Sequence, residues 1–334
     1  MNESRAPLFA SEEGGNVRCG LCPKTCLIKS GVFGACGVRG NKCGKCVIPF
    51  YGFISSMAID PIEKKPLYHF KPGSRILSAG FAGCNLRCPF CQNWRISQNT
   101  DIPGRRMKPG EIISAALRED SPSIAYTYSE PLVHAEYLLD CMALAHKHGI
   151  ANVLVTNGCV NEEPARKILK NTDAANVDLK SFSAVTYSNI LGGRLETALD
   201  FIKLGLDMGV HIEITTLVVP GLNDSEDELD AAMDCIASMD GATPWHLSAY
   251  HPDFRWNAPP TDPLLLLNTA KRAKVKLRHV YTGNISGGEN DTVCSSCGSI
   301  LVKRRGYRTD ISGLKAGEKT YHCAKCGEET GVVR

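Results

Sequence analysis

Cysteine constrains this chain more than any other residue type, because 16 of its 334 residues are cysteines and most of them are clustered. Six lie near the start, three in the middle and four at the end: Cys19, Cys22, Cys26, Cys36, Cys43 and Cys46, then Cys84, Cys88 and Cys91, then Cys294, Cys297, Cys323 and Cys326. In a reducing compartment such spacings indicate metal or iron–sulfur ligation rather than disulfides. The isolated Cys141, Cys159 and Cys235 are expected to be small buried side chains without a role.

Composition and charge place the chain among ordinary globular proteins. Apolar residues make up 43% and charged residues 22% of the sequence, which excludes a disordered or fibrous chain. The formal charge of +3 comes without a long basic block, so we expect no nucleic-acid partner. The start of the sequence has no apolar signal-like run, and the aliphatic stretch 264–267 is too short to cross a bilayer. We therefore expect a cytoplasmic protein with no membrane partner.

The middle of the chain alternates between strand-like runs and helix-like segments. The strand-like runs lie at 75–81, 123–128, 152–157, 176–180, 211–219, 245–250 and 277–284. Between them apolar residues recur at helical spacing, as in PLVHAEYLLDCMALAHKHG. This alternation indicates βαβ units and an α/β fold whose parallel sheet is closed, or partly closed, as a barrel.

In such barrels the site forms on the loops that follow the C-terminal ends of the strands. Unusual polar or turn residues follow all seven predicted strands: the cysteine triplet, then Ser129 and Glu130, Asn157 and Gly158, Asp178 and Lys180, Pro220 and Gly221, His251, and Asn284. We expect one ring of loops to bring them together.

The central triplet has the spacing CxxxCxxC, in GCNLRCPFCQNW. Cys84, Cys88 and Cys91 can bind three irons of a cubane cluster and leave the fourth iron without a protein ligand. A structural zinc site is the alternative, but it normally has four ligands. His69 is the nearest upstream histidine and would be an unusual partner, so the spacing favours a cluster with an open coordination position.

The chain as a whole resembles the radical SAM superfamily, whose members use S-adenosylmethionine (SAM). The resemblance rests on GCNLRCPFCQNWRISQ, AYTYSEP, VTNG, ANVDLKSFS, TTLVVPGLNDSEDEL, WHLSAYHPDFR and YTGNISGGEN, in this order. These strings are similar to the pyruvate formate-lyase activating-enzyme-like branch, and more closely to the AmmeMemoRadiSam system radical SAM enzymes. The similarity extends to CGLCPKTCLI near the start and to CSSCG and CAKCG near the end.

The resemblance implies a [4Fe-4S] cluster on Cys84, Cys88 and Cys91, with SAM bound to the open iron. Reductive cleavage of SAM would give a 5′-deoxyadenosyl radical that abstracts hydrogen from a substrate. The protein would supply ligation, orientation and exclusion of water. An electron donor such as ferredoxin or flavodoxin is implied as a partner, together with an unidentified substrate, either a protein or a small molecule.

The resemblance also assigns cofactor-binding residues. The aromatic Phe90 precedes the third cysteine of the triplet, and Ser129 and Glu130 match the motif that holds the methionyl amino group. The remaining matches lie at later strand ends: Thr156 and Asn157, then Asp178 and Lys180 in the SAM carboxylate region, Gly221 in the turn beside the adenine, and His251, which joins Asp178 and Lys180 in a cation site. A solvated ion pair between Asp178 and Lys180, and a structural His251, are the alternatives.

The two outer clusters predict further metal sites. Cys294, Cys297, Cys323 and Cys326 form two CxxC turns, which is typical of a closed zinc ribbon, although the spacing is also compatible with iron. Cys19, Cys22, Cys26 and Cys36 form a four-ligand group that the resembled family shares, and either zinc or a second iron–sulfur cluster fits it. Cys43 and Cys46 depart from the family pattern, and no role is assigned to them.

These features predict three parts: a Cys-rich segment at 1–72, a partial (β/α)6-type radical SAM barrel at 73–288, and a zinc-ribbon-like module at 289–334. The leading hypothesis is a radical SAM enzyme. A glycyl-radical-enzyme activase that acts on a protein partner remains an alternative, as does a metal-binding adaptor without catalysis. The intact triplet argues against the adaptor.

Overall fold

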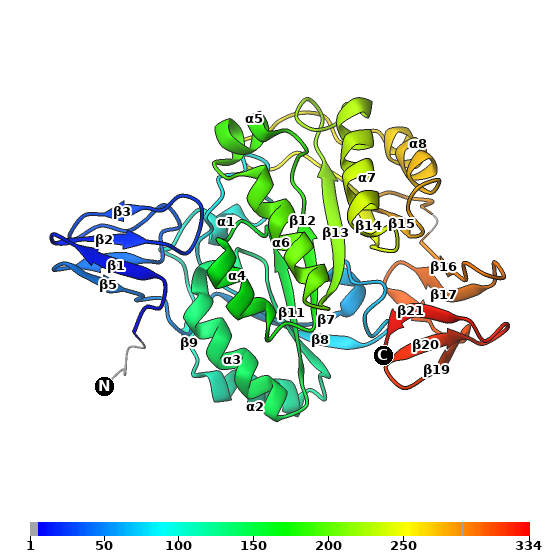
Figure 1. The fold of residues 1–334 in the computed structure, drawn as a ribbon, viewed down its shortest axis with the longest axis horizontal. Helices are drawn as coiled ribbons and strands as arrows, with labels where there is room; N and C mark the ends of the chain where they lie inside the picture. Colours follow the sequence, from blue (N-terminus) through cyan, green and yellow to red (C-terminus); the bar gives the residue numbers. More distant parts are fainter. Residues whose placement is uncertain (1–5, 289) are drawn as a thin grey trace.

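The core of the computed structural model is an eight-stranded sheet, and the structure describes residues 6–288 and 290–334 (Figure 1). The predicted boundary at residue 289 and the first five residues of the predicted N-terminal segment lie outside the described residues. The strands follow the order β15-β14-β13-β12-β11-β10-β8-β7. Their bounds are β7 Ser56–Pro61, β8 Arg75–Gly80, β10 Ser123–Thr127, β11 Ala151–Thr156, β12 Ala174–Asp178, β13 His211–Val218, β14 Trp245–Ala249 and β15 Val280–Gly283.

Seven of these strands, from β8 to β15, run parallel, and β7 pairs antiparallel with β8. Within the described part of the chain, β7 and β15 are the two edges and do not pair with each other. The barrel is therefore open along one side. The predicted α/β fold with a partial barrel is confirmed, whereas the antiparallel strand β7 was not predicted.

Helices connect the parallel strands and cover the outside of the sheet (Figure 1). Their bounds are α1 Trp94–Ser97, α2 Pro109–Arg118, α3 Ala135–Lys147, α4 Glu162–Leu169, α5 Ala184–Thr186, α6 Leu195–Asp207, α7 Glu226–Asp240 and α8 Pro263–Ala273. Local sequence explains where the later ones begin. The Ser225 hydroxyl accepts a bond from the backbone N–H of Glu228 at the start of α7, and Asp262 caps α8 ahead of Pro263.

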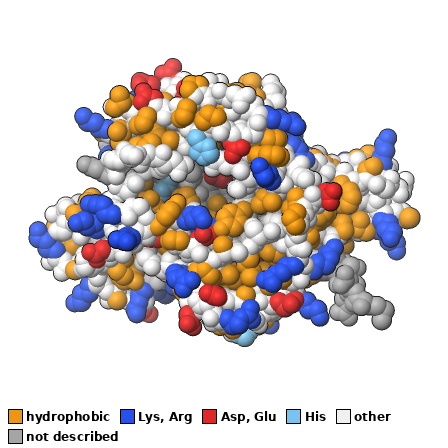
Figure 2. All heavy atoms as spheres, turned by 180° about the vertical axis from the view of Figure 1, so that it is seen from behind, with side chains coloured by type: hydrophobic (Ala, Val, Ile, Leu, Met, Phe, Trp, Pro, Cys, Tyr) orange, Lys and Arg blue, Asp and Glu red, His pale blue; other side chains and the backbone are white. Residues whose placement is uncertain are grey.

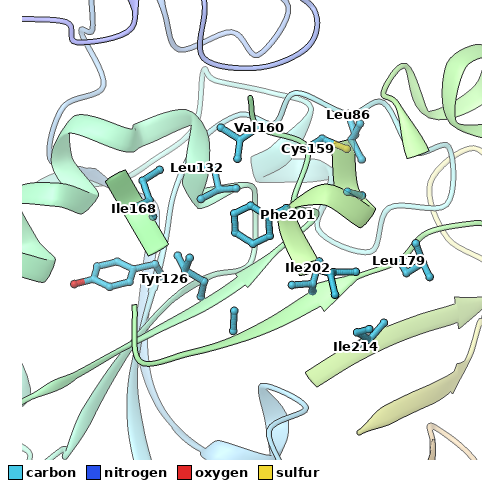
Figure 3. Close-up of a cluster of buried hydrophobic side chains, with 14 of the residues drawn as sticks. Leu86, Tyr126, Leu132, Cys159, Val160, Ile168, Leu179, Phe201, Ile202 and Ile214 are labelled. Carbon is cyan, nitrogen blue, oxygen red and sulfur yellow. The ribbon is translucent and has the colours of Figure 1, made fainter. Parts of the chain in front are cut away.

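The packed layer between helices and sheet is a large apolar core, part of which is drawn in Figure 3. Ile168 of α4 and Phe201 and Ile202 of α6 lie against the sheet, where Tyr126 of β10 and Ile214 of β13 face them. All five side chains are at most 1% exposed. This packing fixes the strands, and with them the loops at their C-terminal ends.

Two small β modules flank the barrel at opposite ends of the molecule (Figure 1). The N-terminal module holds β1 Ala10–Glu13, β2 Asn16–Cys19, β3 Leu27–Ile28, β4 Gly40–Lys42 and β5 Lys45–Val47, and a short sheet of β6 Phe53–Ile54 and β9 Arg105–Arg106 follows it. The C-terminal module holds β16 Thr292–Val293, β17 Ile300–Arg305, β18 Arg308–Asp310, β19 Leu314–Ala316, β20 Thr320–Cys323 and β21 Glu329–Val333. No helix in the described part of the chain is long and apolar enough to span a bilayer.

The isolated cysteines largely meet expectation. Cys141 and Cys159 are fully buried in the core, while Cys235 of α7 is partly exposed.

Candidate active site

A cavity of about 1340 Å³ opens at the C-terminal ends of the parallel strands and continues into the open side of the barrel. Of the predicted site residues, the structure brings the following to its wall: Cys84, Cys88, Phe90, Cys91, Ser129, Glu130, Thr156, Asn157, Asp178 and Lys180. The face drawn in Figure 2 is hollowed near its middle, where histidine and charged side chains border the depression. The cavity is lined by both polar and apolar side chains, and its opening reaches the surface.

Gly221 and His251 do not line this cavity among the described residues. Gly221 has a positive φ of 76°, which favours glycine, and its backbone N–H donates to Asp224. His251 is exposed, and its Nε2 lies 2.9 Å from Nε2 of Gln92, the residue after Cys91. His251 thus lies beside the cavity through Gln92, and the cofactor contacts of both Gly221 and His251 stay predictions.

The cysteine triplet lies on the loop that follows β8. Sulfur contacts hold two of its members: the backbone N–H of Leu86 lies 3.3 Å from Sγ of Cys84, and Sγ of Cys91 lies 3.2 Å from the Ser97 hydroxyl. Burial raises the pKa of the Cys88 thiol to about 12 and that of Cys84 well above its ordinary value. Such thiols stay protonated at neutral pH unless a metal displaces the proton.

Glu130 links the loop after β10 to the end of β11 through hydrogen bonds. Its carboxylate accepts hydrogen bonds from the Thr156 hydroxyl at 2.6 Å and from the backbone N–H groups of Asn157 at 2.9 Å and Leu132 at 3.0 Å. Burial raises the pKa of Glu130 to about 7, although these three donors oppose the shift. The sequence did not indicate this role, in which Glu130 positions the loops after β10 and β11.

Ser129 has the opposite environment. Its hydroxyl is shielded from solvent and has no hydrogen-bond partner among the described residues, although the residue lines the cavity. A buried polar group without a partner costs free energy. The preceding Tyr128 has a φ of 69°, which is strained for a residue other than glycine. The loop after β10 therefore places a hydroxyl without a partner among the described residues next to the cavity.

Asp178 and Lys180 form an ion pair on the cavity wall. Nζ of Lys180 lies 2.9 Å from Oδ2 of Asp178, and both side chains are largely buried, with 19% and 28% exposure. Burial alone would lower the pKa of Lys180, but the Asp178 carboxylate outweighs it, so the net shift is upward. The pair is therefore partly shielded from solvent.

The sequence analysis missed Lys65 and Tyr128, which also line the cavity, and Asp60, which contacts both of them. Oδ2 of Asp60 lies 2.7 Å from Nζ of Lys65 and 2.5 Å from the hydroxyl of Tyr128, and Lys65 also lies over the Tyr128 ring. Burial would raise the pKa of Asp60, but hydrogen bonds from Lys64, Lys65 and Tyr128 hold it below its usual value. Asp60, Lys64 and Lys65 lie close together in the sequence, whereas Tyr128 is 68 positions from Asp60 and no short motif joins it to them.

Arg304 of β17 brings the C-terminal module into the same cavity. Its guanidinium donates to the Thr292 hydroxyl at 2.7 Å and to the backbone carbonyl of Tyr68 at 2.7 Å, and it lies over the Tyr68 ring. The side chain is buried, and among the described residues its Nε has no hydrogen-bond partner and no carboxylate forms an ion pair with it. The module thus forms part of the cavity wall.

The four C-terminal cysteines meet at one point. Their sulfurs all lie within 4.8 Å of one another, and the described residues contain no other such group of three or more candidate ligands. The pairs Cys294–Cys326 and Cys297–Cys323 are each separated by 3.7 Å. A Zn–S bond of about 2.3 Å gives a tetrahedron with an edge of about 3.8 Å. The geometry therefore fits one metal ion.

The N-terminal cysteines separate into two sets. Cys19, Cys22, Cys26 and Cys36 line one small cavity, whereas Cys43 is exposed at the turn between β4 and β5. Cys46 lies on β5 and is partly buried. The set that the family pattern predicted is the one that converges.

Comparisons with known proteins identify the family of the chain. Residues 80–233 match the sequence profile of the Radical SAM superfamily. The chain is 38% identical over 334 residues to "Uncharacterized protein MJ0808" of Methanocaldococcus jannaschii, covering 98% of this chain and 99% of that protein. It is 27% identical over 189 residues to the pyruvate formate-lyase-activating enzyme of Clostridium pasteurianum, covering 54% of this chain and 76% of that enzyme.

A radical SAM methyltransferase from Sphaerobacter thermophilus shares the fold, with a TM-score of 0.51, 13% identity, and coverage of 64% of this chain and 67% of that one. The chain belongs to the radical SAM superfamily. It is a radical SAM enzyme whose substrate is unspecified, and the family implies a [4Fe-4S] cluster and SAM.

The residues present fit these two groups. Three thiols on one loop can bind a cluster and leave one iron open, and the partnerless Ser129 hydroxyl and the Asp178–Lys180 pair border the same cavity. When bound, the cluster and SAM supply one-electron reductive cleavage and a 5′-deoxyadenosyl radical. The chain's own residues position the loops, offer polar contacts and enclose the cavity.

Proposed function

We propose that this radical SAM enzyme binds its cluster through Cys84, Cys88 and Cys91 and binds SAM beside Ser129, Asp178 and Lys180. The observation that carries the proposal is that all three cysteines line the same cavity as these polar residues. Phe90, Thr156 and Asn157 complete the wall, and Glu130 positions it. Gly221 and His251 remain candidates at its edge, through the adenine turn and through Gln92.

The substrate, in this proposal, is a peptide segment of a protein that enters through the open side of the barrel. The cavity of about 1340 Å³ exceeds the range of about 300 to 1,000 Å³ that is common for a single ligand, which leaves room beside SAM. Arg304, Thr215 and Thr282 also line the cavity, and Arg304 Nε and both threonine hydroxyls have no hydrogen-bond partner among the described residues. Carbonyl and carboxylate groups of a peptide would satisfy these donors.

Relatives named as pyruvate formate-lyase-activating enzymes act, by their name, on another enzyme. Their match to this chain covers about half of it, at 54%, so much of the chain has no counterpart in that match. We therefore keep a glycyl-radical activase as the second candidate rather than the first. An electron donor of the ferredoxin or flavodoxin type would serve either reaction.

We assign zinc to the C-terminal cysteines, because four thiolates in a closed tetrahedron suit that ion. The proposed organisation is a metal-bearing N-terminal module at 1–72, a catalytic barrel at 73–288 and a zinc module at 289–334. The number of free thiols fits a reducing cytoplasm.

The test is a comparison of Cys88→Ala with wild type and with Cys235→Ala, a matched control at a partly exposed cysteine in α7. After anaerobic reconstitution, Cys88→Ala should lose SAM cleavage and the triplet-bound iron but keep the C-terminal metal, because the two sites share no ligand. Cys235→Ala should behave as wild type. SAM cleavage at the wild-type rate by Cys88→Ala would refute the assignment.

A further inference from the structure

The four cysteines of the N-terminal module converge around one interior space. Cys19, Cys22, Cys26 and Cys36 line a cavity of about 10 Å³, together with the apolar Val133 of the barrel. Backbone hydrogen bonds shape the turn that carries three of them: the N–H of Cys19 donates to the carbonyl of Cys26, and the N–H of Thr25 donates to that of Cys22. The folded turn therefore brings together cysteines that lie up to 17 positions apart in the sequence.

The spacing of these sulfurs differs from that of the C-terminal set. A single metal ion requires its four thiolate sulfurs at the corners of one small tetrahedron. Among the described residues, only the C-terminal cysteines have their sulfurs all within 4.8 Å of one another. Neither the N-terminal set nor the triplet at Cys84, Cys88 and Cys91 does. Ligands of a multi-iron cluster bind separate irons and are held further apart. The N-terminal set therefore shares the wider arrangement of the triplet.

A buried cation faces the same cavity. Arg39 is 1% exposed, and its Nη1 bonds both carboxylate oxygens of Glu136, at 2.7 and 3.0 Å. Its Nε and Nη2 are buried and have no hydrogen-bond partner among the described residues, yet Arg39 lines the cavity with the four cysteines. Thiolate and sulfide sulfurs accept hydrogen bonds, and an anionic centre would satisfy these donors.

The N-terminal cysteine loop packs directly on the triplet loop. Gly83, which precedes Cys84, has a φ of 80°, and a Cβ placed there would lie 2.4 Å from the carbonyl oxygen of Cys36. Arg87, within the triplet, donates to the carbonyl of Cys84 at 2.9 Å and also to the carbonyl of Ala35. The cavity with four cysteines is thus adjacent to the proposed SAM site.

We propose that Cys19, Cys22, Cys26 and Cys36 bind a second iron–sulfur cluster of the four-iron type, with hydrogen bonds from Arg39. Four thiolates ligate every iron of such a cluster, so it has no open position for SAM. This distinguishes it from the cluster at Cys84, Cys88 and Cys91. The exposed Cys43 takes no part in it.

The decisive experiment uses the full chain with Cys84, Cys88 and Cys91 all replaced by alanine. After anaerobic reconstitution this variant should retain about four irons and four sulfides per chain. It should also give an electron paramagnetic resonance (EPR) signal after reduction with dithionite. Less than one iron per chain, with an added equivalent of zinc at the N-terminal cysteines, would overturn the proposal.

Two further changes in the same background locate the site. Adding Cys22→Ser and Cys36→Ser should remove the remaining iron and the EPR signal, whereas adding Cys43→Ser should leave both unchanged. Retention of zinc at the C-terminal site and an unchanged circular dichroism spectrum show that the chain still folds. Iron retained after the Cys22→Ser and Cys36→Ser changes would overturn the ligand assignment. The experiment involves no SAM cleavage, so its failure is distinguishable from failure of the proposed function.

Arg39 is tested by changing it together with its partner, since the single change would leave Glu136 buried without its cation. In the triple-alanine background, Arg39→Gln with Glu136→Gln should retain the iron but shift the reduction potential to a more negative value. The reason is that hydrogen bonds to sulfur stabilise the more negative reduced cluster. An unchanged potential would overturn the assignment of Arg39.

Discussion

At the scale of single residues, the site combines polar groups that have hydrogen-bond partners with polar groups that have none among the described residues. Glu130 accepts three hydrogen bonds from the protein, whereas the neighbouring Ser129 hydroxyl has no partner among the described residues. Both were predicted from one sequence motif. Their environments differ because Glu130 points back to the end of β11, and a motif gives no such orientation.

Ser129→Ala tests the role of the partnerless hydroxyl. We expect the KM for SAM to rise by roughly ten-fold or more, since a hydrogen bond to a charged group contributes about 1.5 to 3 kcal/mol. The melting temperature of the SAM-free protein should not fall, because the hydroxyl has no hydrogen-bond partner among the described residues. A lower melting temperature with an unchanged KM would mean that the hydroxyl has a structural role instead.

His134 gives a pH dependence of stability. Burial lowers its pKa to about 4, and its Nε2 lies 2.8 Å from the carbonyl oxygen of Ala82. The folded chain therefore resists protonation that the unfolded chain accepts at about pH 6.5. The contribution of His134 to the free energy of unfolding is therefore complete above pH 6.5 and is lost as the pH falls to 4. The loss is at most about 3 kcal/mol.

Chemical unfolding of wild type and His134→Gln across pH 4 to 7 measures this contribution. Glutamine keeps an N–H for Ala82 but does not titrate, so the free energy of unfolding should depend less on pH in this window. Other buried histidines, such as His279 with a pKa lowered to about 4, contribute equally to both proteins. Identical pH profiles would contradict the assignment.

At the scale of elements, strand and helix positions in the barrel were predictable because each carries its own pattern. The runs at 123–128 and 152–157 became β10 and β11 almost unchanged. β7 was missed, since SMAIDP lies at an edge and contains a proline and an aspartate. Its Asp60 is nevertheless the centre of the Lys64, Lys65 and Tyr128 contacts.

The C-terminal module should depend on its metal. Its own core is small, with Leu301 and Val302 packed beside Cys294 and Cys323, so metal binding supplies much of the folding free energy. Cys323→Ser should lose one zinc per chain and make the module sensitive to trypsin. The iron at the triplet should stay, as no ligand is shared.

Limited proteolysis with metal analysis tests this, with Cys235→Ser as the control. The control should keep its zinc and its resistance to trypsin. A Cys323→Ser protein that keeps both would show that the four cysteines do not form a metal site.

At the scale of the whole molecule, the modules at the two ends both reach the barrel. The C-terminal module contributes Arg304 to the main cavity, and the N-terminal module places Cys36 against Gly83. The sequence predicted the modules from their cysteines but not these contacts. Contacts such as Arg304 with Tyr68 join residues 236 positions apart, and nothing local in the sequence encodes them.

The convergence of the four C-terminal cysteines was predictable from spacing, because each CxxC turn holds its two thiols close together in any fold. The ring of polar strand ends followed from the parallel topology for Ser129, Asn157, Asp178 and Lys180. Gly221 and His251 obeyed the same rule but lie outside the cavity wall. Strand order fixes the edge at which a loop lies, whereas the path of the loop is set by packing.

The measurement that tests the central claim most directly is SAM cleavage by the reconstituted wild-type protein. The protein is reduced with dithionite without oxygen, and 5′-deoxyadenosine and methionine are quantified. The account predicts both products in equal amounts, dependent on reductant and on bound iron. A protein that holds its iron at Cys84, Cys88 and Cys91 but forms no 5′-deoxyadenosine would contradict it.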